Sequence, residues 1–501
     1  MNCARRHRSS IFGTTTLGAL TLTALCVLLL VAARPAQAQY AVLYTFGLFP
    51  SDGIYPLSGL AFDGAENLYG TTTEGGLYTD GTVYELQAGS WGENILYNFT
   101  GGSDGSCFWG LSGAGCSNVI LDSQGNLYGT APAGGAYGLG VVFELSPTGT
   151  ETVLHSFGGP GDGHNPAGGV IMDSQGNLYG TTQSDYYQED TLGIVYELSP
   201  SGETWTESII YSLPNYDYLN GGLAMDTAGN IYGTSYNTVF KLSPNGQGGW
   251  NPTVIHTFTG APKDGSVASG APVLDQAGNL YGKTTSGGSK DDGTVYKLTP
   301  QENGKWKEKI LYNFTIEQWA TSVVLDATDN IYGTEVYGGS FGDGLVFELV
   351  APVGAGAYKE RTLLSFNGKD GAAPFASLIF DGAGKLYGTT EVGGYGGYGV
   401  VYELNPSAQS TTTTLTSSPN PSSYGEEVTF SAVVAPAPAD GESISFMEST
   451  NVLGTGTLSG GVATLSYSAL PVGTSKITAA YGGDLTFDGS TSNVVKQKVK
   501  K

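Results

Sequence analysis

The chain has 501 residues, of which 78 are Gly and only 13% are charged, against about 25% in an average globular protein. Its 21 Lys and Arg stand against 45 Asp and Glu, which gives a formal net charge of −24 at pH 7. This charge argues against nucleic acid as a partner and against a polybasic membrane-surface protein, because both kinds of binding use clustered cations.

Residues 1–38 are typical of a secretory signal peptide. Arg5, Arg6 and Arg8 make the head positive, a long apolar stretch follows, and a small-x-small cleavage sequence ends at Ala38. An uncleaved anchor helix is the alternative. No second long apolar run follows in the sequence, so we expect an exported protein without a later membrane span.

Two cysteines remain beyond this segment, Cys107 and Cys116, with the eight residues 108–115 between them. In an oxidising compartment such a pair is expected to form a local disulfide that pins its loop. A metal site would need further ligands nearby, and the surrounding sequence offers none. The sequence therefore predicts a disulfide.

One sequence unit recurs seven times after the signal segment. In each copy an apolar run ends in Asp, a turn follows, and Leu or Ile, Tyr and Gly come next. The copies are marked by Tyr69, Tyr128, Tyr179, Tyr232, Tyr281, Tyr332 and Tyr387. Their average spacing of about 53 residues is too long for one coil of a β-helix and is close to the length of a propeller blade.

Each unit contains four short strand-like runs, most of them separated by Gly, Asn, Asp, Ser or Pro. In the third unit these runs cover 169–173, 177–182, 194–198 and 208–213. No window has the 3.6-residue apolar spacing of a helix, so we predict all-β repeats. Both faces of the strands carry apolar or small groups, as expected for a sheet stacked between similar sheets. The Gly after each repeat Tyr predicts that an aromatic ring of a neighbouring sheet packs over it.

The order of the strands predicts how the array ends. Residues 42–46 match the fourth strand of other units but precede the first unit, and the last unit ends at its third strand, 400–404. The first strand of the chain would then complete the last sheet. We therefore predict a seven-bladed β-propeller over 39–405, closed by its N-terminal strand.

After residue 405 the composition changes to Ser, Thr and Pro, which indicates a linker over 406–410. Short alternating strands over 411–498 then suit a Greek-key β-sandwich. This segment contains no Cys, so its stability would come from packing alone.

Two resemblances to known families rest on these residues. The pattern GNLYGTT–GG–GTVYEL–ILYNF, with good copies at 125–130 and 293–298, resembles the GloVer tandem repeats of bacterial choice-of-anchor exported proteins over 40–404. That resemblance implies an exported repeat protein and supplies no catalytic residues. Residues 477–490 resemble bacterial Ig-like domains, which implies that 411–498 is an Ig-like β-sandwich acting as a spacer or adhesive module outside the cell.

The histidines offer little acid–base chemistry. His155 and His256 occupy one repeat position where other units have Tyr or Leu, so we interpret it as a packing position. His164 lies in the loop before the third unit's first strand and is the candidate acid–base imidazole, but the sequence shows no partner for it.

Asp residues end the first strand of every unit: Asp63, Asp122, Asp173, Asp226, Asp275, Asp326 and Asp381. We interpret each carboxylate as the acceptor of backbone N–H bonds in an Asx-type turn. Calcium is the alternative, because carboxylates and turn carbonyls suit a hard cation, and no other cofactor is expected. A second series, each member followed by Gly, lies between units, although units four and six lack it: Asp52, Asp104, Asp162, Asp264 and Asp370.

Tryptophans fall into two groups. Four of them stand just before the fourth strand of their units and are interpreted as hairpin caps: Trp91, Trp205, Trp250 and Trp306. Trp109 and Trp319 lie in loops before first strands, where they are freer to meet a ligand. Because Trp109 lies beside the predicted disulfide, a pinned aromatic loop in the second unit is the best single candidate for a contact site.

The near-uniform units favour a non-catalytic binding or adhesion scaffold, since catalysis needs loops with unlike charged groups. We expect a monomer at the cell surface, in the periplasm or in the medium, and a glycan or protein surface as its partner. Trp109, His164 and Trp319 are the expected contact residues. The alternative is a carbohydrate-active enzyme, a polysaccharide hydrolase or lyase with its site at the channel mouth.

Overall fold

The computed structural model describes residues 40–501, except 109–114, 160–161, 167, 184–192, 203, 214–218, 220, 317–318, 320, 353–355, 407–410, 439, 450, 484–486 and 488. The predicted signal peptide and Trp109 lie outside the described residues. The described chain forms two compact units, Tyr40–Pro406 and the residues that follow up to Lys501. All regular elements of the described residues are β-strands.

The first unit consists of small antiparallel sheets, and the described residues include seven with four strands each. Sheet 1 is β3 (Ala61–Phe62), β4 (Leu68–Thr72), β6 (Thr82–Leu86) and β7 (Glu93–Asn98); sheet 2 is β8 (Ile120–Leu121), β9 (Leu127–Ala131), β10 (Val141–Leu145) and β11 (Glu151–Ser156); sheet 3 is β12 (Ile171–Met172), β13 (Leu178–Thr181), β14 (Ile194–Ser201) and β15 (Thr204–Ser212). Sheet 4 is β16 (Ala224–Met225), β17 (Ile231–Thr234), β18 (Thr238–Pro244) and β19 (Trp250–Thr257); sheet 5 is β20 (Gly265–Leu274), β21 (Leu280–Gly287), β22 (Thr294–Pro300) and β23 (Trp306–Asn313). Sheet 6 is β24 (Val324–Leu325), β25 (Ile331–Glu335), β26 (Leu345–Val350) and β27 (Lys359–Ser365); sheet 7 is β28 (Ile379–Phe380), β29 (Leu386–Thr390), β30 (Val400–Leu404) and β1 (Tyr40–Thr45). A two-stranded ladder of β2 (Gly53–Ile54) and β5 (Glu74–Gly75) adds to these.

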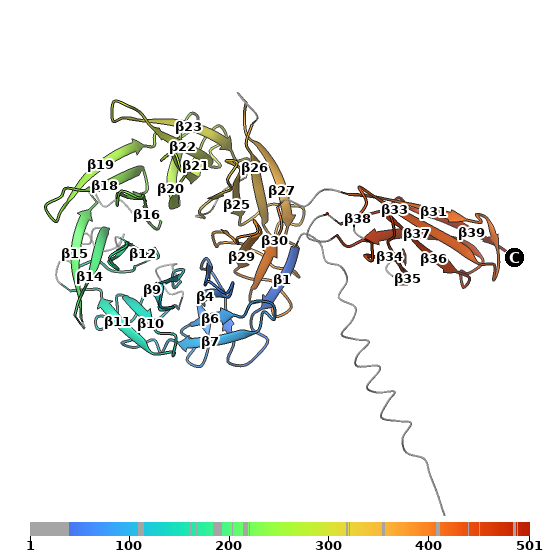
Figure 1. The fold of residues 1–501 in the computed structure, drawn as a ribbon, viewed down its shortest axis with the longest axis horizontal. Helices are drawn as coiled ribbons and strands as arrows, with labels where there is room; N and C mark the ends of the chain where they lie inside the picture. Colours follow the sequence, from blue (N-terminus) through green and yellow to red (C-terminus); the bar gives the residue numbers. More distant parts are fainter. Residues whose placement is uncertain are drawn as a thin grey trace, which may run out of the picture. The chain divides into compact units, whose positions relative to one another are not determined.

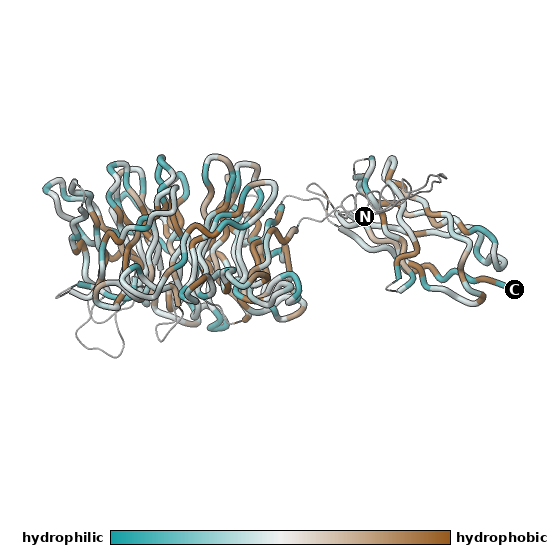
Figure 2. Tube along the Cα trace, turned by 90° about the horizontal axis from the view of Figure 1, so that it is seen from below, coloured by the Kyte–Doolittle hydropathy of each residue, from teal (hydrophilic) through white to brown (hydrophobic). Residues whose placement is uncertain are grey.

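Figure 1 shows these sheets set around a ring, with β7, β15, β19, β23, β27 and β1 toward the rim. Sheet 7 combines the two ends of the unit, because β1 pairs antiparallel with β30 from Tyr40 opposite Leu404 to Thr45 opposite Val400. Figure 2 shows the same unit from the side, with most of the apolar chain between the two edges of the ring.

Each hydrophobic core of this unit lies between two sheets rather than within one. Between sheets 1 and 2, Val83 packs with Leu127 and Phe143, all nearly or fully buried. Between sheets 7 and 1, Tyr387 packs with Tyr84 in the same way. Burying a Leu, Val or aromatic side chain stabilises a fold by about 1.5–3 kcal/mol, so the contacts between sheets are the main favourable term in this unit.

The Gly after each repeat Tyr faces an aromatic ring of its own sheet. Gly129 lies directly opposite Phe143 in the β9–β10 ladder, and a Cβ on Gly129 would lie 2.7 Å from Phe143 Cζ. The same pairing occurs in every repeat: Gly70–Tyr84, Gly180–Tyr196, Gly233–Phe240, Gly282–Tyr296, Gly333–Phe347 and Gly388–Tyr402. The sequence prediction of a ring from a neighbouring sheet is therefore wrong, because the cross-strand partner folds over the bare backbone instead.

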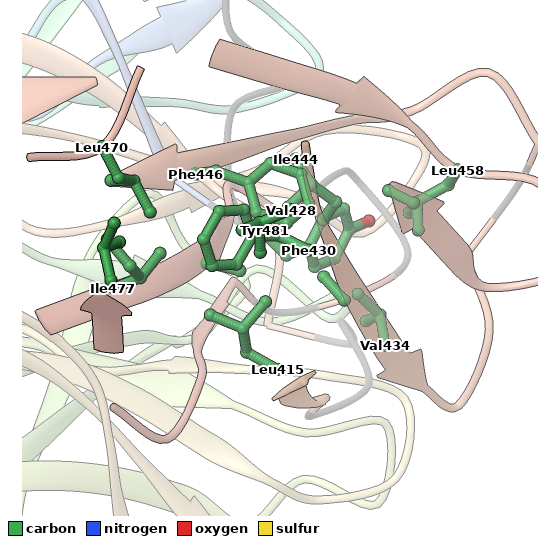
Figure 3. Close-up of a cluster of buried hydrophobic side chains, with 14 residues drawn as sticks. Leu415, Val428, Phe430, Val434, Ile444, Phe446, Leu458, Leu470, Ile477 and Tyr481 are labelled. Carbon is green, nitrogen blue, oxygen red and sulfur yellow. The ribbon is translucent and has the colours of Figure 1, made fainter. Parts of the chain in front are cut away.

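The second unit contains two sheets. One consists of β31 (Thr412–Ser418), β33 (Val428–Ala435) and β36 (Val462–Tyr467). The other consists of β32 (Ser422–Ser423), β39 (Val495–Lys500), β37 (Gly473–Tyr481), β34 (Ser443–Glu448) and β35 (Asn451–Thr457), with β38 (Ser490–Thr491) beside β37. Side chains from both sheets form one core, in which Phe430 and Phe446 are fully buried (Figure 3). Buried and exposed positions alternate along β33, as expected for a sheet with one covered face.

No helix in the described part of the chain has the length and apolar character needed to span a membrane.

The Gly–aromatic pairs predict a stability effect. In Gly388→Ala the new Cβ would lie 2.6 Å from the Tyr402 hydroxyl oxygen and 2.9 Å from Leu378 Cδ2. Overpacking of this kind costs about 1–3 kcal/mol, so we expect the free energy of unfolding to fall by that amount in urea titrations.

The matched control is Gly382→Ala in the turn of the same sheet, where a new Cβ would have no atom within 4 Å. We expect no measurable loss of stability from this substitution. Equal stability of the two variants would contradict the packing role of the Gly–aromatic pair.

Candidate functional site

The ring has two different edges. Because neighbouring strands in each sheet are antiparallel, the connections after the second and fourth strands lie at one edge, which we call the loop face. The connections after the first and third strands lie at the other edge, which we call the turn face. In sheet 6, the described residues of 314–323 and 336–344 belong to the loop face, and those of 326–330 and 351–358 belong to the turn face.

The strand-ending Asp residues form hydrogen-bonded turns on the turn face. In the turn after β24, Asp326 Oδ1 accepts bonds from the backbone N–H of Thr328 (2.8 Å) and of Asn330 (2.9 Å). Its Oδ2 accepts from the Asn330 amide (2.8 Å) and from the Tyr332 hydroxyl (3.1 Å). Burial favours the neutral acid, but these donors outweigh it and lower the pKa of Asp326.

The other repeats carry the same turn, and each Asp accepts the backbone N–H groups two and four residues later: Asp63, Asp122, Asp173, Asp226, Asp275 and Asp381. Each also accepts from its repeat Tyr hydroxyl. The carboxylates thus hold the turn and orient the Tyr that packs between sheets. A calcium ion at these residues would have to replace these donors.

The hairpin tryptophans also pack between sheets. Trp250 lies 5.7 Å from the ring of Tyr179 in the preceding sheet, measured between ring centroids. Trp91, Trp205 and Trp306 contact Tyr387, Tyr128 and Tyr232 in the same way. They therefore seal the sheet boundaries on the turn face and do more than cap their own hairpins.

Polar clusters bridge neighbouring sheets at the end of the fourth strands, toward the loop face. The Tyr44 hydroxyl lies 3.2 Å from Asp52 Oδ2 and 3.0 Å from Glu93 Oε2 of the next sheet. The Tyr97 hydroxyl bonds to Asp104 Oδ2 at 2.9 Å in the next boundary. We call such a set of one fourth-strand residue and two carboxyls a junction.

His155 and His256 occupy the Tyr position in two of the junctions. The ring of His256 packs on Phe258, with centroids 4.6 Å apart, while its Nε2 faces two carboxyls. His155 Nε2 lies 3.1 Å from Asp162 Oδ2 and 3.9 Å from Glu207 Oε1. Interpreting this position as one of packing alone is therefore incomplete, because a polar atom reaches the carboxyls while the ring fills the core.

The junctions shift several pKa values. Burial and the charge of Asp52 raise the pKa of Glu93 to about 8, and burial and Asp104 raise that of Glu151 to about 7. Burial disfavours charge on His155, but the bond to Asp162 and the charge of Glu207 outweigh it and raise its pKa. For His256 burial prevails over Asp264 and lowers the pKa.

The structure separates the predicted contact residues. His164 is buried in the connection before sheet 3, and its backbone bridges Gln183. Trp319 lies before sheet 6 with 44% of its surface exposed, and its ring contacts Tyr337 and Phe375 at centroid distances of 6.2 and 5.9 Å. Trp109 belongs to the part of the chain left undescribed.

Cys107 and Cys116 form a disulfide beside that undescribed segment. Both cysteines are buried in the core between sheets 1 and 2, where they pack with Phe99 and Phe143. The crosslink is thus part of the contact between two sheets as well as the base of a loop.

Exposed aromatic side chains gather on the loop face. In the described part of Tyr40–Pro406, every exposed aromatic residue lies in one of its connections: Phe49, Tyr78, Phe108, Tyr137, Tyr236, Trp319, Tyr337, Phe341, Tyr395 and Tyr398. Of this set, only Trp319 was predicted from the sequence as a contact residue. The available signal was the loop after the second strand in units 1, 2, 6 and 7, in which an aromatic residue recurs beside a Gly pair.

A cavity of about 460 Å³ opens on the loop face between sheets 5 and 6. Tyr312 and Glu360 line it from the outer strands β23 and β27, and the Tyr312 hydroxyl donates to the Glu360 carboxylate. Gly338, Gly339 and Ser340 line it from the loop, and this loop also carries the exposed rings of Tyr337 and Phe341. The cavity with this aromatic edge is the candidate site.

The Asp turns predict a loss of stability on removal of one carboxylate. Asp326→Asn keeps the size of the side chain but places a second donor against the Asn330 amide or the Tyr332 hydroxyl. Because a buried donor without an acceptor costs about 1–3 kcal/mol, we expect the free energy of unfolding to fall by that amount. Asp329→Asn, at an exposed position in the same turn, is the control and should leave stability unchanged in urea titrations.

The raised pKa of Glu93 predicts a pH dependence. Glu93 binds its proton more tightly in the folded protein than in the unfolded chain, so protonation of Glu93 stabilises the fold. This contribution to the free energy of unfolding is complete below the ordinary Glu pKa of 4.5 and is lost as the pH rises through about 8. Between pH 6 and pH 9 we therefore expect Glu93→Gln to show a smaller fall in Tm than the wild type in calorimetry. The control Glu302→Gln, at an exposed position, should show the same fall in Tm as the wild type. A fall in Tm of Glu93→Gln as steep as that of the wild type would contradict the prediction.

No curated protein matches the chain. Among solved structures the chain is similar to the extracellular domains of two B. thetaiotaomicron proteins assigned to hybrid two-component systems, BT3049 and BT4673. The identities are 10% and 13% and the TM-scores 0.46 and 0.47; the alignments cover 93% and 91% of this chain but only 58% and 60% of those chains. A polysaccharide lyase of family PL25, an ulvan lyase, is 11% identical at a TM-score of 0.45, over 72% of this chain and 95% of its own.

A family comparison gives a match over most of the sequence. The sequence model of the Gloeobacter/Verrucomicrobia repeat matches residues 6–238 and 235–458, which confirms the repeat family expected from the LYG motifs. The chain belongs to the Gloeobacter/Verrucomicrobia repeat family.

Proposed function

We propose that this protein is an exported, non-catalytic binding scaffold whose loop face holds a neutral polysaccharide. The proposal includes a cleaved signal peptide over 1–38 and a seven-bladed β-propeller over 39–405 closed by its N-terminal strand. It also includes a linker over 406–410 and an Ig-like sandwich over 411–498. Export is supported by the Arg-headed apolar segment and by a disulfide, which persists in oxidising compartments.

The observation that carries the binding role is the gathering of all exposed described aromatics of the ring on one face. Tyr and Trp offer large, rigid contact areas at a low entropic cost, because each has only two side-chain torsions. On the turn face the aromatics are used instead for packing between sheets. The exposed aromatic side chains of the loop face thus remain available to a partner.

The chemistry of the face favours a neutral glycan. With a net charge of −24, the chain would repel a polyanionic partner, and its loop-face connections are rich in Gly and hydroxyl groups rather than in cations. Flat aromatic faces can stack on sugar rings while backbone amides and hydroxyls bond to their hydroxyl groups. Trp319, Tyr337 and Phe341, beside the cavity, are the residues we expect to carry the contact.

Affinity electrophoresis of the full chain against neutral β-glucan, xylan and mannan tests this role. We expect retardation by at least one of them, no release of reducing or unsaturated ends, and an affinity about tenfold lower in Trp319→Ala with Tyr337→Ala. Tyr424→Ala, at a 67% exposed position of the second unit, is the control and should bind as the wild type does.

Two outcomes would contradict the proposal. Migration unaffected by all three polysaccharides would remove the binding role. Release of sugar products would replace it by the enzymatic alternative, for which the Tyr312–Glu360 pair in the cavity would be the first residues to substitute.

A further inference from the structure

Two junctions of the ring gather one imidazole and two carboxyls. His256, Asp264 and Glu308 place one nitrogen and two oxygens within 4.8 Å of one another, and so do His155, Asp162 and Glu207. In each set the His is the second-last residue of a fourth strand, the first carboxyl lies in the next connection, and the second lies in the fourth strand of the following sheet. The two sets therefore occupy equivalent places, although in the second His155 Nε2 already lies within hydrogen-bonding distance of Asp162 Oδ2, at 3.1 Å.

The distances in the His256 junction suit shared coordination better than hydrogen bonding. His256 Nε2 lies 3.6 Å from Asp264 Oδ1 and 3.5 Å from Glu308 Oε1, whereas a good N–H···O bond is about 2.9 Å long. Two ligands of a tetrahedral Zn²⁺, each about 2.0–2.2 Å from the ion, lie about 3.4 Å apart. Only small side-chain movements would be needed to accept the ion.

Burial of these atoms is a second and independent indication. Asp264 is 7% exposed, and its Oδ1, His256 Nε2 and Glu308 Oε1 are all buried with no hydrogen bond to a group outside the junction. Leaving a buried polar atom unpaired costs about 1–3 kcal/mol, and more where the group is charged. A single cation among the three would satisfy all of them.

Hydrogen bonds from Thr259 orient the Asp264 carboxylate toward His256. Asp264 Oδ2 accepts bonds from the backbone N–H of Thr259 (2.7 Å) and from its hydroxyl (3.0 Å), which leaves Oδ1 directed at the imidazole. Such bonds fix the orientation of a ligating carboxylate. His256 and Glu308 keep 17% and 18% of their side-chain surfaces exposed, so the junction lies close to the protein surface.

We propose that the His256–Asp264–Glu308 junction, and with it the His155–Asp162–Glu207 junction, binds a divalent transition-metal cation of the Zn²⁺ class. One imidazole nitrogen and two carboxylate oxygens suit Zn²⁺, with water at the fourth position, better than they suit Ca²⁺ or Mg²⁺, which prefer oxygen ligands alone. The ion would join β19 to β23, and β11 to β15, as a clip between neighbouring sheets.

The Tyr junctions supply the matched control. At the equivalent position the Tyr44 hydroxyl reaches both carboxyls directly, so His155→Tyr with His256→Tyr should fold while removing the imidazole ligands. We expect equilibrium dialysis of the untagged full chain against ZnCl₂, with metal analysis, to give two Zn²⁺ per wild-type chain. The double variant should retain none above the background of the assay.

Two further measurements distinguish loss of the metal site from a folding defect. Asp264→Asn with Glu308→Gln, which keeps both side-chain sizes, should lose one of the two ions and keep the other. Zn²⁺ should raise the Tm of the wild type and leave that of the His-to-Tyr variant unchanged. Equal Zn²⁺ content in the wild type and in a folded His-to-Tyr variant would overturn the proposal, as would a wild-type Tm unaffected by Zn²⁺.

Discussion

The fold of Tyr40–Pro406 depends on one packing constraint: a four-stranded sheet with apolar groups on both faces cannot cover itself and must be covered by its neighbours. Each core found in this unit accordingly contains residues of two sheets. The Gly of each LYG motif allows an aromatic ring of the third strand to fold across the second strand, which keeps the sheet thin where its neighbour approaches. The repeat Tyr and the hairpin Trp then close the same boundary nearer the turn face.

This constraint also decides where polar groups are found. Carboxylates near the sheet boundaries lose water, so each needs a donor from the protein. On the turn face the Asp turns supply backbone N–H groups, an amide and a Tyr hydroxyl. At the junctions the donor is a Tyr hydroxyl, as at Tyr44, and in two of them a His takes the place of the Tyr. On the loop face some described rings also pack between sheets, as Trp319 does with Phe375, but ten aromatic residues of the described connections keep an exposed surface for binding.

Periodicity predicted the all-β class, the family of the repeats and the four strands of each unit, because these follow from local residue patterns. Strand lengths were less accessible: the first strand of the third unit was expected over 169–173 but covers only Ile171–Met172. The aromatic ring that packs on each LYG Gly was predicted to come from a neighbouring sheet but comes from the same sheet. Spacing along a chain does not distinguish these two sources. The junctions were missed because Tyr and His share a packing shape, although Asp-Gly after the strand and Glu in the next unit recur with them.

The pairing of β1 with β30 has a consequence for the order in which the unit can fold. The strand synthesised first in this unit lies against the strand synthesised last, so sheet 7 remains incomplete until residue 404 is available. The long loop that this pairing closes carries an entropic penalty, and contacts of such large sequence separation slow folding. During that interval the edge of β1 that pairs with β30 has no partner, and unpaired strand edges of this kind make incomplete chains prone to aggregation.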